Sequence, residues 1–170
     1  MPQSVLVAYT SVHGSTKEVA EAVAGTLRDS GLPVDFQPLR EVRSLAAYSA
    51  VVVGAPLYMF RWHKDARRFL SRHREALKNM PVAVFALGPF NVDEKEFTGA
   101  REQLDKALAK FPWLTPVVIE IFGGKFDPAH LRFPYNLIPA MKQMPVTDIR
   151  DWDAIRAWAG GLPAKFWPVS

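Results

Sequence analysis

Short apolar runs alternate with amphipathic segments along almost the whole chain of 170 residues, and this alternation limits the fold more than any other feature. Ser4–Tyr9, Ala50–Gly54 and Val82–Leu87 are rich in β-branched and other apolar residues, as strands are. The run AVVVG at 50–54 is apolar throughout, which is typical of a central strand covered on both faces of a parallel sheet. Two further runs, Val34–Leu39 and Val117–Phe122, complete five predicted strands, and the prolines around the first indicate an edge strand.

The segments between these runs have helical spacing. Ser15–Asp29 carries apolar residues at helical intervals and is followed by Gly31, a stop signal. We predict further helices over 62–78, Thr98–Lys110 and Asp151–Ala159, with Asp151 as the cap of the last. Strands that alternate with helices predict an α/β fold, a doubly wound parallel sheet with helices on both faces. Because only 123–148 breaks the rhythm, we expect a single domain over residues 1–170 with an irregular insertion at about 123–148.

The first predicted loop, Thr10–Thr16, follows a strand and precedes a helix, which is where ligands bind in doubly wound sheets. It offers four hydroxyl side chains and the N–H groups of a helix N-terminus, whose dipole favours an anion. Gly14 lets the backbone approach a ligand closely or adopt a positive φ. A phosphate is the expected occupant, and a hydroxyl-rich turn without a ligand is the alternative.

Other phosphate-binding motifs do not fit this loop. A Walker loop requires G-x-x-x-x-G-K-[ST], and Lys17 has no such frame before it. A dinucleotide fingerprint requires three glycines, whereas this loop has Gly14 alone. Because the loop itself contains neither Lys nor Arg, we expect a phosphomonoester held by neutral donors.

Two more loops add aromatic side chains. The stretch GAPLYMFRW at 54–62 is crowded with large apolar residues, of which Tyr58, Phe60 and Trp62 are candidates to pack against an aromatic ring system. Trp62 has an alternative role beneath the following helix. The third loop, 87–91, supplies backbone polar groups and Phe90. A phosphate at one end and aromatic walls at the other describe a site for flavin mononucleotide (FMN).

The first loop and its helix resemble the phosphate-binding signature of the flavodoxin family, at Tyr9, Ser11, Gly14, Thr16, Ala20 and Val23. The resemblance implies a flavodoxin-like five-stranded parallel sheet with strand order 2-1-3-4-5 and FMN as the cofactor. The cofactor-binding residues that it implies, over the three loops, are Ser11, Val12, His13, Gly14, Ser15, Thr16, Pro56, Leu57, Tyr58, Met59, Leu87, Gly88, Pro89, Phe90 and Asn91.

Longer stretches are similar to flavodoxin-domain proteins of the menaquinone-dependent protoporphyrinogen oxidase type, namely GAPLYMFRWHKDARRFL, FGGKFDPAHLRFPYNLIPAMKQM and DIRDWDAIRAWA. This likeness implies an FMN-dependent oxidoreductase that oxidises a porphyrinogen and passes electrons to a quinone. No catalytic residue is assigned, because the flavin supplies the chemistry. His130, Arg132 and Lys142, with the apolar residues of 129–144, are expected to form a basic, apolar surface beside the flavin, or else to cover the sheet edge without a redox role.

Two other functions remain open. One is a flavodoxin-type electron carrier without its own substrate, and the other is a flavodoxin-like domain that binds no flavin. The formal charge of +4 argues against a strongly acidic low-potential shuttle. Pro89 and Val92 stand where such proteins often have an acid and a stacking Tyr, so we expect less opposition to the anionic reduced flavin and easier two-electron chemistry.

Composition limits the remaining classes. The chain has no cysteine, which excludes disulfides, iron–sulfur centres and thiol nucleophiles, and no histidine spacing predicts a metal site. The basic stretch 61–78 is interpreted first as a solvated helix face, with contact to an anionic membrane surface or to a partner protein as the alternatives, and no nucleic-acid-binding motif accompanies it. With neither a signal peptide nor a membrane-spanning run, we expect a cytoplasmic protein, with peripheral contact at the inner face of the membrane left open.

Overall fold

A computed structural model of the chain describes residues 3–58, 61–131, 133 and 135–169. The strands, in chain order, are β1 (Val5–Tyr9), β2 (Val34–Pro38), β3 (Ala50–Tyr58), β4 (Arg61–Trp62), β5 (Val82–Leu87), β6 (Val118–Phe122), β7 (Lys125–Phe126) and β8 (Thr147–Asp148). The α-helices are α1 (Ser15–Asp29), α2 (Lys64–Arg72), α3 (Arg74–Leu77), α4 (Glu94–Leu108), α5 (Pro139–Lys142), α6 (Trp152–Gly160) and α7 (Leu162–Phe166). The 3₁₀ turns within the described ranges are η1 (Leu39–Glu41), η2 (Pro128–His130) and η3 (Tyr135–Leu137).

The main sheet has the order β2-β1-β3-β5-β6, and these five strands are parallel. Counted along the chain without the short hairpin strand β4, this order is 2-1-3-4-5, so the predicted fold class and strand order are confirmed. β1 lies between β2 and β3, so the direction of winding reverses beside it. The loops after β1, β3 and β5 therefore lie at the edge where a doubly wound sheet binds its ligand.

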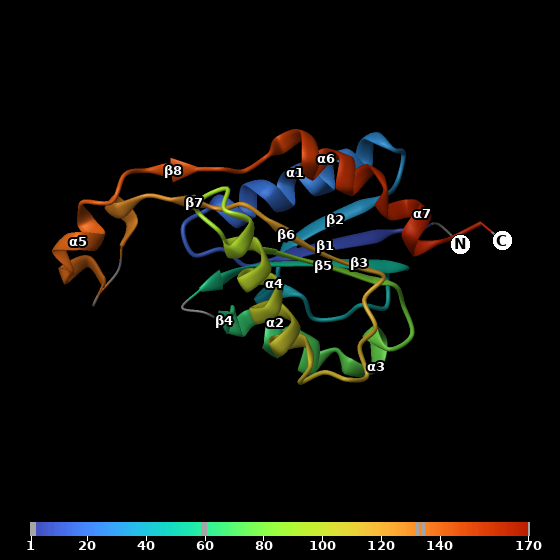
Figure 1. Ribbon diagram of the computed structural model, residues 1–170. Coiled ribbons are helices and arrows are strands. Elements are labelled where there is room, and N and C mark those ends of the chain that lie inside the picture. The colour runs from blue at the N-terminus through green and yellow to red at the C-terminus, as the bar shows by residue number, and fades with distance from the viewer. Residues whose placement is uncertain (1–2, 59–60, 132, 134, 170) are drawn as a thin grey trace.

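Helices cover both faces of the sheet (Figure 1). One apolar cluster joins the sheet to α1, α6 and α7, and a second joins it to α2, α3 and α4. The side chains of Val51, Val52 and Val53 are completely buried because alternate residues of β3 enter opposite clusters. The apolar run AVVVG is thus explained by burial on both faces.

Gly54 in β3 lies in register with Phe85 in β5. A Cβ atom added to Gly54 would lie 2.1 Å from Phe85 Cζ, so the Phe85 ring occupies the space that a side chain would need. The ring also packs against Phe122 and Trp158, with centroids 5.8 and 5.9 Å away. Glycine at position 54 is therefore required by packing in the middle of the sheet.

The largest differences from the predicted element boundaries lie at 62–78, at the end of β3 and at the start of α4. The helix predicted over 62–78 is instead a strand residue, Trp62, followed by α2 and α3, which are separated at His73 (φ −105°, ψ 23°). The ring of His73 is buried and packs 4.7 Å from the ring of Phe69. β3 runs on to Tyr58 because it pairs with β4, and α4 begins at Glu94 because the Asp93 side chain caps it.

Residues 125–148 form an arm that leaves the body of the fold (Figure 1). Its base is the antiparallel pair of β7 and β8, in which Lys125 lies opposite Asp148 and Phe126 opposite Thr147. The arm extends from the end of the sheet opposite both chain termini (Figure 1). This is the region that breaks the strand–helix rhythm of the sequence.

Candidate functional site

The first loop joins β1 to α1 and is shaped by Ser11 and Gly14. The N–H of Gly14 donates to the Ser11 hydroxyl over 2.8 Å, and Gly14 has a φ of +91°, which glycine adopts without steric cost. No side chain of the described residues caps α1 at this position. The N–H groups of the first helical turn, which have no carbonyl partner within the helix, thus remain available to a ligand.

Thr16 is the residue of this loop that most clearly suits a ligand. Its side chain is 1% exposed, and its hydroxyl has no hydrogen-bond partner within the described part of the chain. A buried hydroxyl without a partner costs free energy that a bound acceptor recovers. Because the hydroxyl lies beside the open N-terminus of α1, an anionic oxygen is the group that fits both sets of donors.

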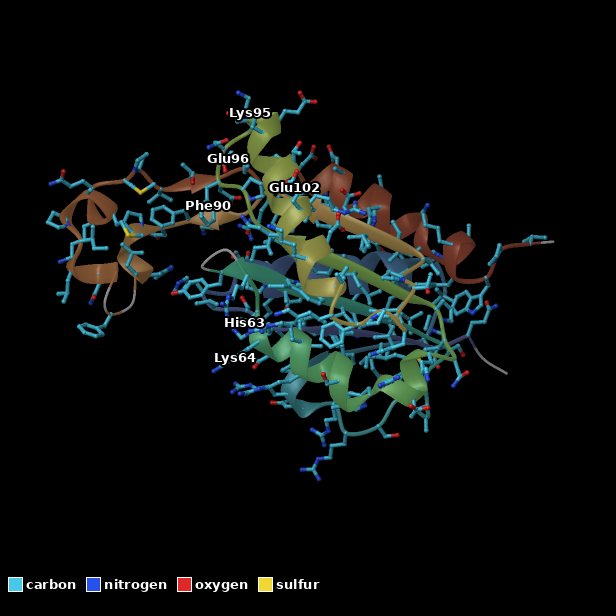
Figure 2. All side chains as sticks on the ribbon, turned by 60° about the horizontal axis from the view of Figure 1, so that its bottom comes forward. His63, Lys64, Phe90, Lys95, Glu96 and Glu102 are labelled. Atoms are coloured by element: carbon cyan, nitrogen blue, oxygen red, sulfur yellow. The ribbon has the colours of Figure 1, made fainter. Side chains whose placement is uncertain are left out.

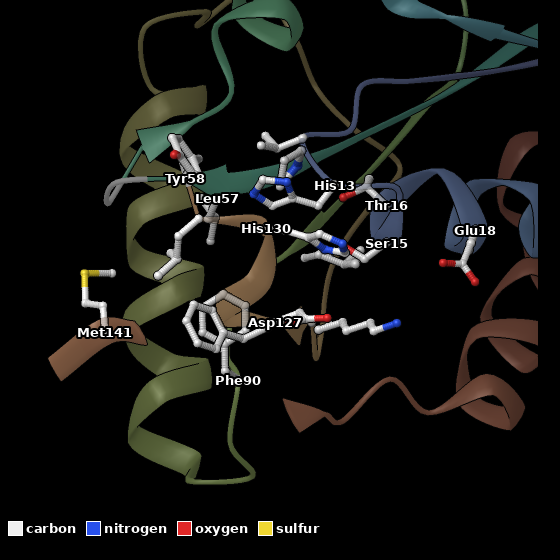
Figure 3. Close-up of a pocket in the computed structure, with 17 residues that line it drawn as sticks. His13, Ser15, Thr16, Glu18, Leu57, Tyr58, Phe90, Asp127, His130 and Met141 are labelled. Atoms are coloured by element: carbon white, nitrogen blue, oxygen red, sulfur yellow. The ribbon is translucent and has the colours of Figure 1, made fainter. Parts of the chain in front are cut away.

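A cavity of about 210 Å³ opens beside this loop. Its walls include Leu57 and Tyr58 from the end of β3, and Phe90 from the loop after β5 (Figure 3). The rings of Tyr58 and Phe90 are 38% and 43% exposed, which is unusual for large aromatic side chains at strand ends. The loop donors at one end and the aromatic rings at the other therefore line a single cavity.

The predicted cofactor-binding residues divide into three groups. Those that line the cavity are Val12, His13, Ser15, Thr16, Pro56, Leu57, Tyr58, Leu87 and Phe90. Those that do not line it are Ser11, Gly14, Gly88, Pro89 and Asn91. Met59, together with the aromatic candidate Phe60, lies outside the described residues.

The predicted residues that do not line the cavity form its supporting loops. The carbonyl of Pro89 accepts from the N–H of Gly124 over 2.8 Å, and the N–H of Gly88 donates to the carbonyl of Phe122. The Asn91 side chain accepts from the N–H of Asp93, the residue that caps α4. These contacts hold the third loop against the strand that leads into the arm.

Trp62 packs beneath the following helix, which is the alternative to packing against an aromatic ring system. It is completely buried under α2 and α4, and its indole N–H donates to the carbonyl of Ala55 over 3.2 Å. The ring therefore belongs to the core and does not line the cavity.

The arm completes the cavity, and His130, Leu131 and Met141 from the predicted segment 129–144 line it. The imidazole rings of His130 and His13 stack with centroids 5.6 Å apart, which joins the arm to the first loop (Figure 3). The arm residue Arg132 lies outside the described residues. Sequence reasoning missed five lining residues, Glu18, Gly124, Lys125, Phe126 and Asp127.

Arg150 fixes the base of the arm to the start of α1. Its side chain is 4% exposed, pairs with Asp148 at 2.7 Å and Glu18 at 3.5 Å, and donates to the carbonyl of Ser15. Hydrogen bonding from Arg150 lowers the pKa of Asp148, and the same hydrogen bond raises the pKa of Arg150. The guanidinium also lies 4.8 Å from the ring centre of Trp152, so one cation joins β8, α1 and α6.

Comparison with known proteins was consistent with this geometry. Residues 6–143 match the family model of the flavodoxin domain. The chain is 25% identical over 165 residues to the protoporphyrinogen IX dehydrogenase [quinone] of Escherichia coli K12, and the alignment covers 91% of each chain. No helix in the described ranges is long and apolar enough to cross a membrane.

Solved structures of similar shape include two flavodoxins. A cysteine-to-serine mutant of the flavodoxin from Pseudomonas aeruginosa has a TM-score of 0.60 at 17% identity, over 96% of this chain and 98% of that one. A flavodoxin from the domain Archaea has a TM-score of 0.58 at 15% identity, with the same coverage. At this identity the likeness establishes the fold alone.

Proposed function

The chain belongs to the flavodoxin domain family, and from this membership we propose that it binds FMN in the cavity between the first loop, the end of β3 and the arm. We further propose that it acts as an oxidoreductase on a small organic donor and a quinone. The observation that carries the proposal is the buried hydroxyl of Thr16, unpartnered among the described residues, beside the open N-terminus of α1.

The first loop would hold the phosphate. The Thr16 hydroxyl would donate to a phosphate oxygen, and the N–H groups of the first turn of α1 would do the same. Ser11 keeps Gly14 in its left-handed conformation and so presents these donors together. Arg150 donates to the carbonyl of Ser15 and pairs with Asp148 and Glu18, so it fixes the position of the turn.

The aromatic walls would hold the flavin ring. Tyr58 and Phe90 offer exposed ring faces, and Leu57 and Met141 supply apolar contacts that exclude water. Bound FMN supplies two-electron redox chemistry, which none of these side chains can perform. The role of the chain is therefore to bind, orient and shield the ring, and no side chain is assigned as an acid or base.

The part of the cavity that the arm forms favours substrate oxidation over simple electron carriage. His130, Leu131 and Met141 come from the arm, so the ring edge would face a structured surface of this chain. The E. coli relative is named for porphyrinogen oxidation with a quinone, which supports the same pair of substrates here. In each turnover the donor would lose two electrons and two protons, and the quinone would gain both to form its hydroquinone.

The arm also supports contact with a membrane surface, where apolar quinones reside. Leu137, Ile138 and Met144 are exposed, and Lys142 lies among them in the sequence. An exposed apolar surface with a basic residue suits binding to anionic lipid. Sedimentation with vesicles that contain anionic lipid tests this contact, and an arm variant with Leu137→Ser and Ile138→Ser should remain in the supernatant.

The first experiment identifies the cofactor. Purified protein is denatured, and the released chromophore is separated and compared with FMN, FAD and riboflavin. Release of FMN in near-equal molar amount is the expected result. Protein that contains no flavin, and that does not take up FMN when it is supplied, contradicts the proposal.

The second experiment separates oxidoreductase from carrier. Anaerobically reduced protein should be reoxidised rapidly by a menaquinone analogue and then reduced again by protoporphyrinogen. A protein that exchanges single electrons with protein partners but reacts with neither small molecule is a carrier.

A further inference from the structure

A second cavity, of about 650 Å³, adjoins the first, the proposed flavin cavity, at Tyr58. We call it the cationic cavity, because its walls include Arg40 from η1, Arg61 from β4, and Lys64 and Arg67 from α2. Tyr58 and Val12 line both cavities, so the two share a wall. Figure 2 shows Lys64 and His63 at the N-terminal end of α2.

The positive charge in this cavity is largely uncompensated. Arg61 and Lys64 form no ion pair with any residue that the structure describes, and both are exposed. Arg67 is half-buried, and its Nε atom is buried without a hydrogen-bond partner within the described ranges. A buried guanidinium donor without an acceptor is costly, so an anion in the cavity would be stabilising.

Asp65, the carboxylate in the described lining of the cavity, is already engaged. It accepts a hydrogen bond from the Thr10 hydroxyl over 3.0 Å, and Arg40 Nε lies 3.5 Å away. Of the four permanent cations, Arg40 pairs with this carboxylate, and Arg61, Lys64 and Arg67 have no ion-pair partner among the described residues. The pKa of His63 is lowered chiefly by burial; Asp65 raises it, and Lys64, Arg40 and Arg67 lower it.

Apolar rings stand beside these charges. Tyr58 contributes a half-exposed ring, and Phe133, which is 75% exposed, lines the same cavity. An inorganic anion would leave both rings in water, whereas a ligand with an apolar, planar body would cover them. The lining thus fits a molecule that carries anionic groups on an unsaturated ring system.

We propose that the cationic cavity binds the carboxylate groups of a small organic redox substrate and so positions its ring system against Tyr58, beside the flavin cavity. The inference rests on the proposed function, because it takes the bound molecule to be the electron donor. Arginine side chains suit this task, since the planar guanidinium matches a carboxylate with two parallel hydrogen bonds. The cations converge on a hollow, which favours a small molecule over a flat acidic protein surface.

Binding can be tested without electron transfer, using the oxidised flavin-loaded protein. The probe is naphthalene-2,6-dicarboxylate, and its dimethyl ester is the neutral control of the same shape. We expect the dicarboxylate to bind, to perturb the flavin absorption spectrum, and to weaken as salt is raised from low to high ionic strength. The ester should bind at least about fivefold more weakly, because it cannot pair with Arg or Lys.

Matched variants locate the site. Arg61→Gln with Lys64→Gln should weaken the dicarboxylate about five- to tenfold, a loss of the size expected for two partly exposed charge pairs. Arg67→Gln alone should weaken it by a similar factor. Lys95→Gln with Lys106→Gln removes the same charge from α4, where Lys95 is labelled in Figure 2, and should leave binding unchanged.

Three outcomes would overturn the inference. The first is equal binding of the dicarboxylate and its ester, and the second is equal loss in the α2 and α4 variants. The third is binding of an acidic polypeptide, poly-glutamate, that the dicarboxylate cannot displace, since this would make the surface a protein-docking site. A protein that binds the dicarboxylate in the cationic cavity but fails to oxidise any donor contradicts the proposed function and leaves the binding site intact.

Discussion

The Thr10 hydroxyl donates a 3.0 Å hydrogen bond to the Asp65 carboxylate, 55 residues further along the chain. This bond joins the start of the first loop to the first turn of α2. Asp65 is buried, with 7% of its surface exposed, so the hydrogen bond from the hydroxyl replaces hydration that the carboxylate has lost. Thr10 and Asp65 both line the cationic cavity, and Val12, two residues after Thr10, lines both cavities.

Thr10→Val should lower the free energy of unfolding by about 1.5–3 kcal/mol, because a buried carboxylate loses a hydrogen bond without regaining water. Urea denaturation measures the loss. Thr98→Val is the matched control, since the Thr98 hydroxyl bonds only to the carbonyl of Glu94 on an exposed helix face. Equal effects of the two substitutions would show that the Thr10–Asp65 hydrogen bond contributes no more to the free energy of unfolding than an exposed hydrogen bond.

Thr16→Val should weaken FMN by roughly ten- to a hundredfold, the usual value of a hydrogen bond to a charged group. Riboflavin, which lacks the phosphate, should bind as it does to the unchanged protein. The flavin-free variant should be no less stable, because the hydroxyl that is removed has no partner among the described residues. Fluorescence titration gives both dissociation constants, and an equal loss for the two flavins would refute the phosphate role.

Tyr58→Ala should weaken FMN and riboflavin by the same factor, about three- to tenfold, since the ring is common to both ligands. Phe90→Ala should act in the same way from the opposite wall. Phe133→Ala is the control, because Phe133 lines the cationic cavity and not the flavin cavity. A loss confined to FMN would mean that Tyr58 contacts the phosphate end.

Gly54→Ala should destabilise the protein by roughly 1–3 kcal/mol through overpacking against Phe85. Combination with Phe85→Leu should recover part of this loss, so that the two effects are not additive. Gly25→Ala in α1 provides the contrast, because a Cβ atom there meets nothing within 4 Å and alanine favours a helix. A Gly54→Ala protein as stable as Gly25→Ala would contradict the packing argument.

Stability should fall as the pH is lowered from about 6.5 towards 5. Burial lowers the pKa of His63 and of His73 in the folded chain, so the unfolded chain takes up these protons first. The stability that the two histidines contribute is complete above their unfolded pKa of about 6.5. It is lost as the pH falls through their pKa values in the folded chain. A proton on His73 Nε2 would be buried without a partner among the described residues.

Urea denaturation at pH 7 and pH 5 tests this dependence. His73→Gln should reduce the change between the two values, because one of the two histidines is then absent. Stability that rises on acidification, or a change unaffected by His73→Gln, would disagree with the buried histidines as its source. The lowered pKa of Asp148 acts only below about 3.8 and does not enter this range.

The sequence contained enough to predict the central architecture, because most of the five strands are short apolar runs separated by helical patterns, and the order follows from the family resemblance. The cap of α6 at Asp151 and the helix stop signal at Gly31 could also be predicted, since each acts through its own local backbone. The start of α4 was missed although Asp93 is a good capping residue, because Asp93 stands before a polar turn rather than before apolar positions.

Other features depend on contacts between distant residues and could not be read locally. β7 and β8 have two residues each and lie more than twenty residues apart, so neither produces a periodic pattern. Arg61, Lys64 and Arg67 were visible as a basic stretch, but their convergence with Arg40 arises only when η1 packs against α2. The helix break at His73 reflects the burial of its ring against Phe69.

The β7–β8 pair has a consequence for how proteins of this shape diverge. Because Phe126 and Thr147 are paired neighbours, the chain can lose or exchange everything between them and still close with a short turn. The arm can thus be exchanged as a unit, separately from the sheet that carries the phosphate loop. Evolution can replace one arm by another and so adapt the same cofactor-binding sheet to a new donor. The pairing of the central strands stays unchanged.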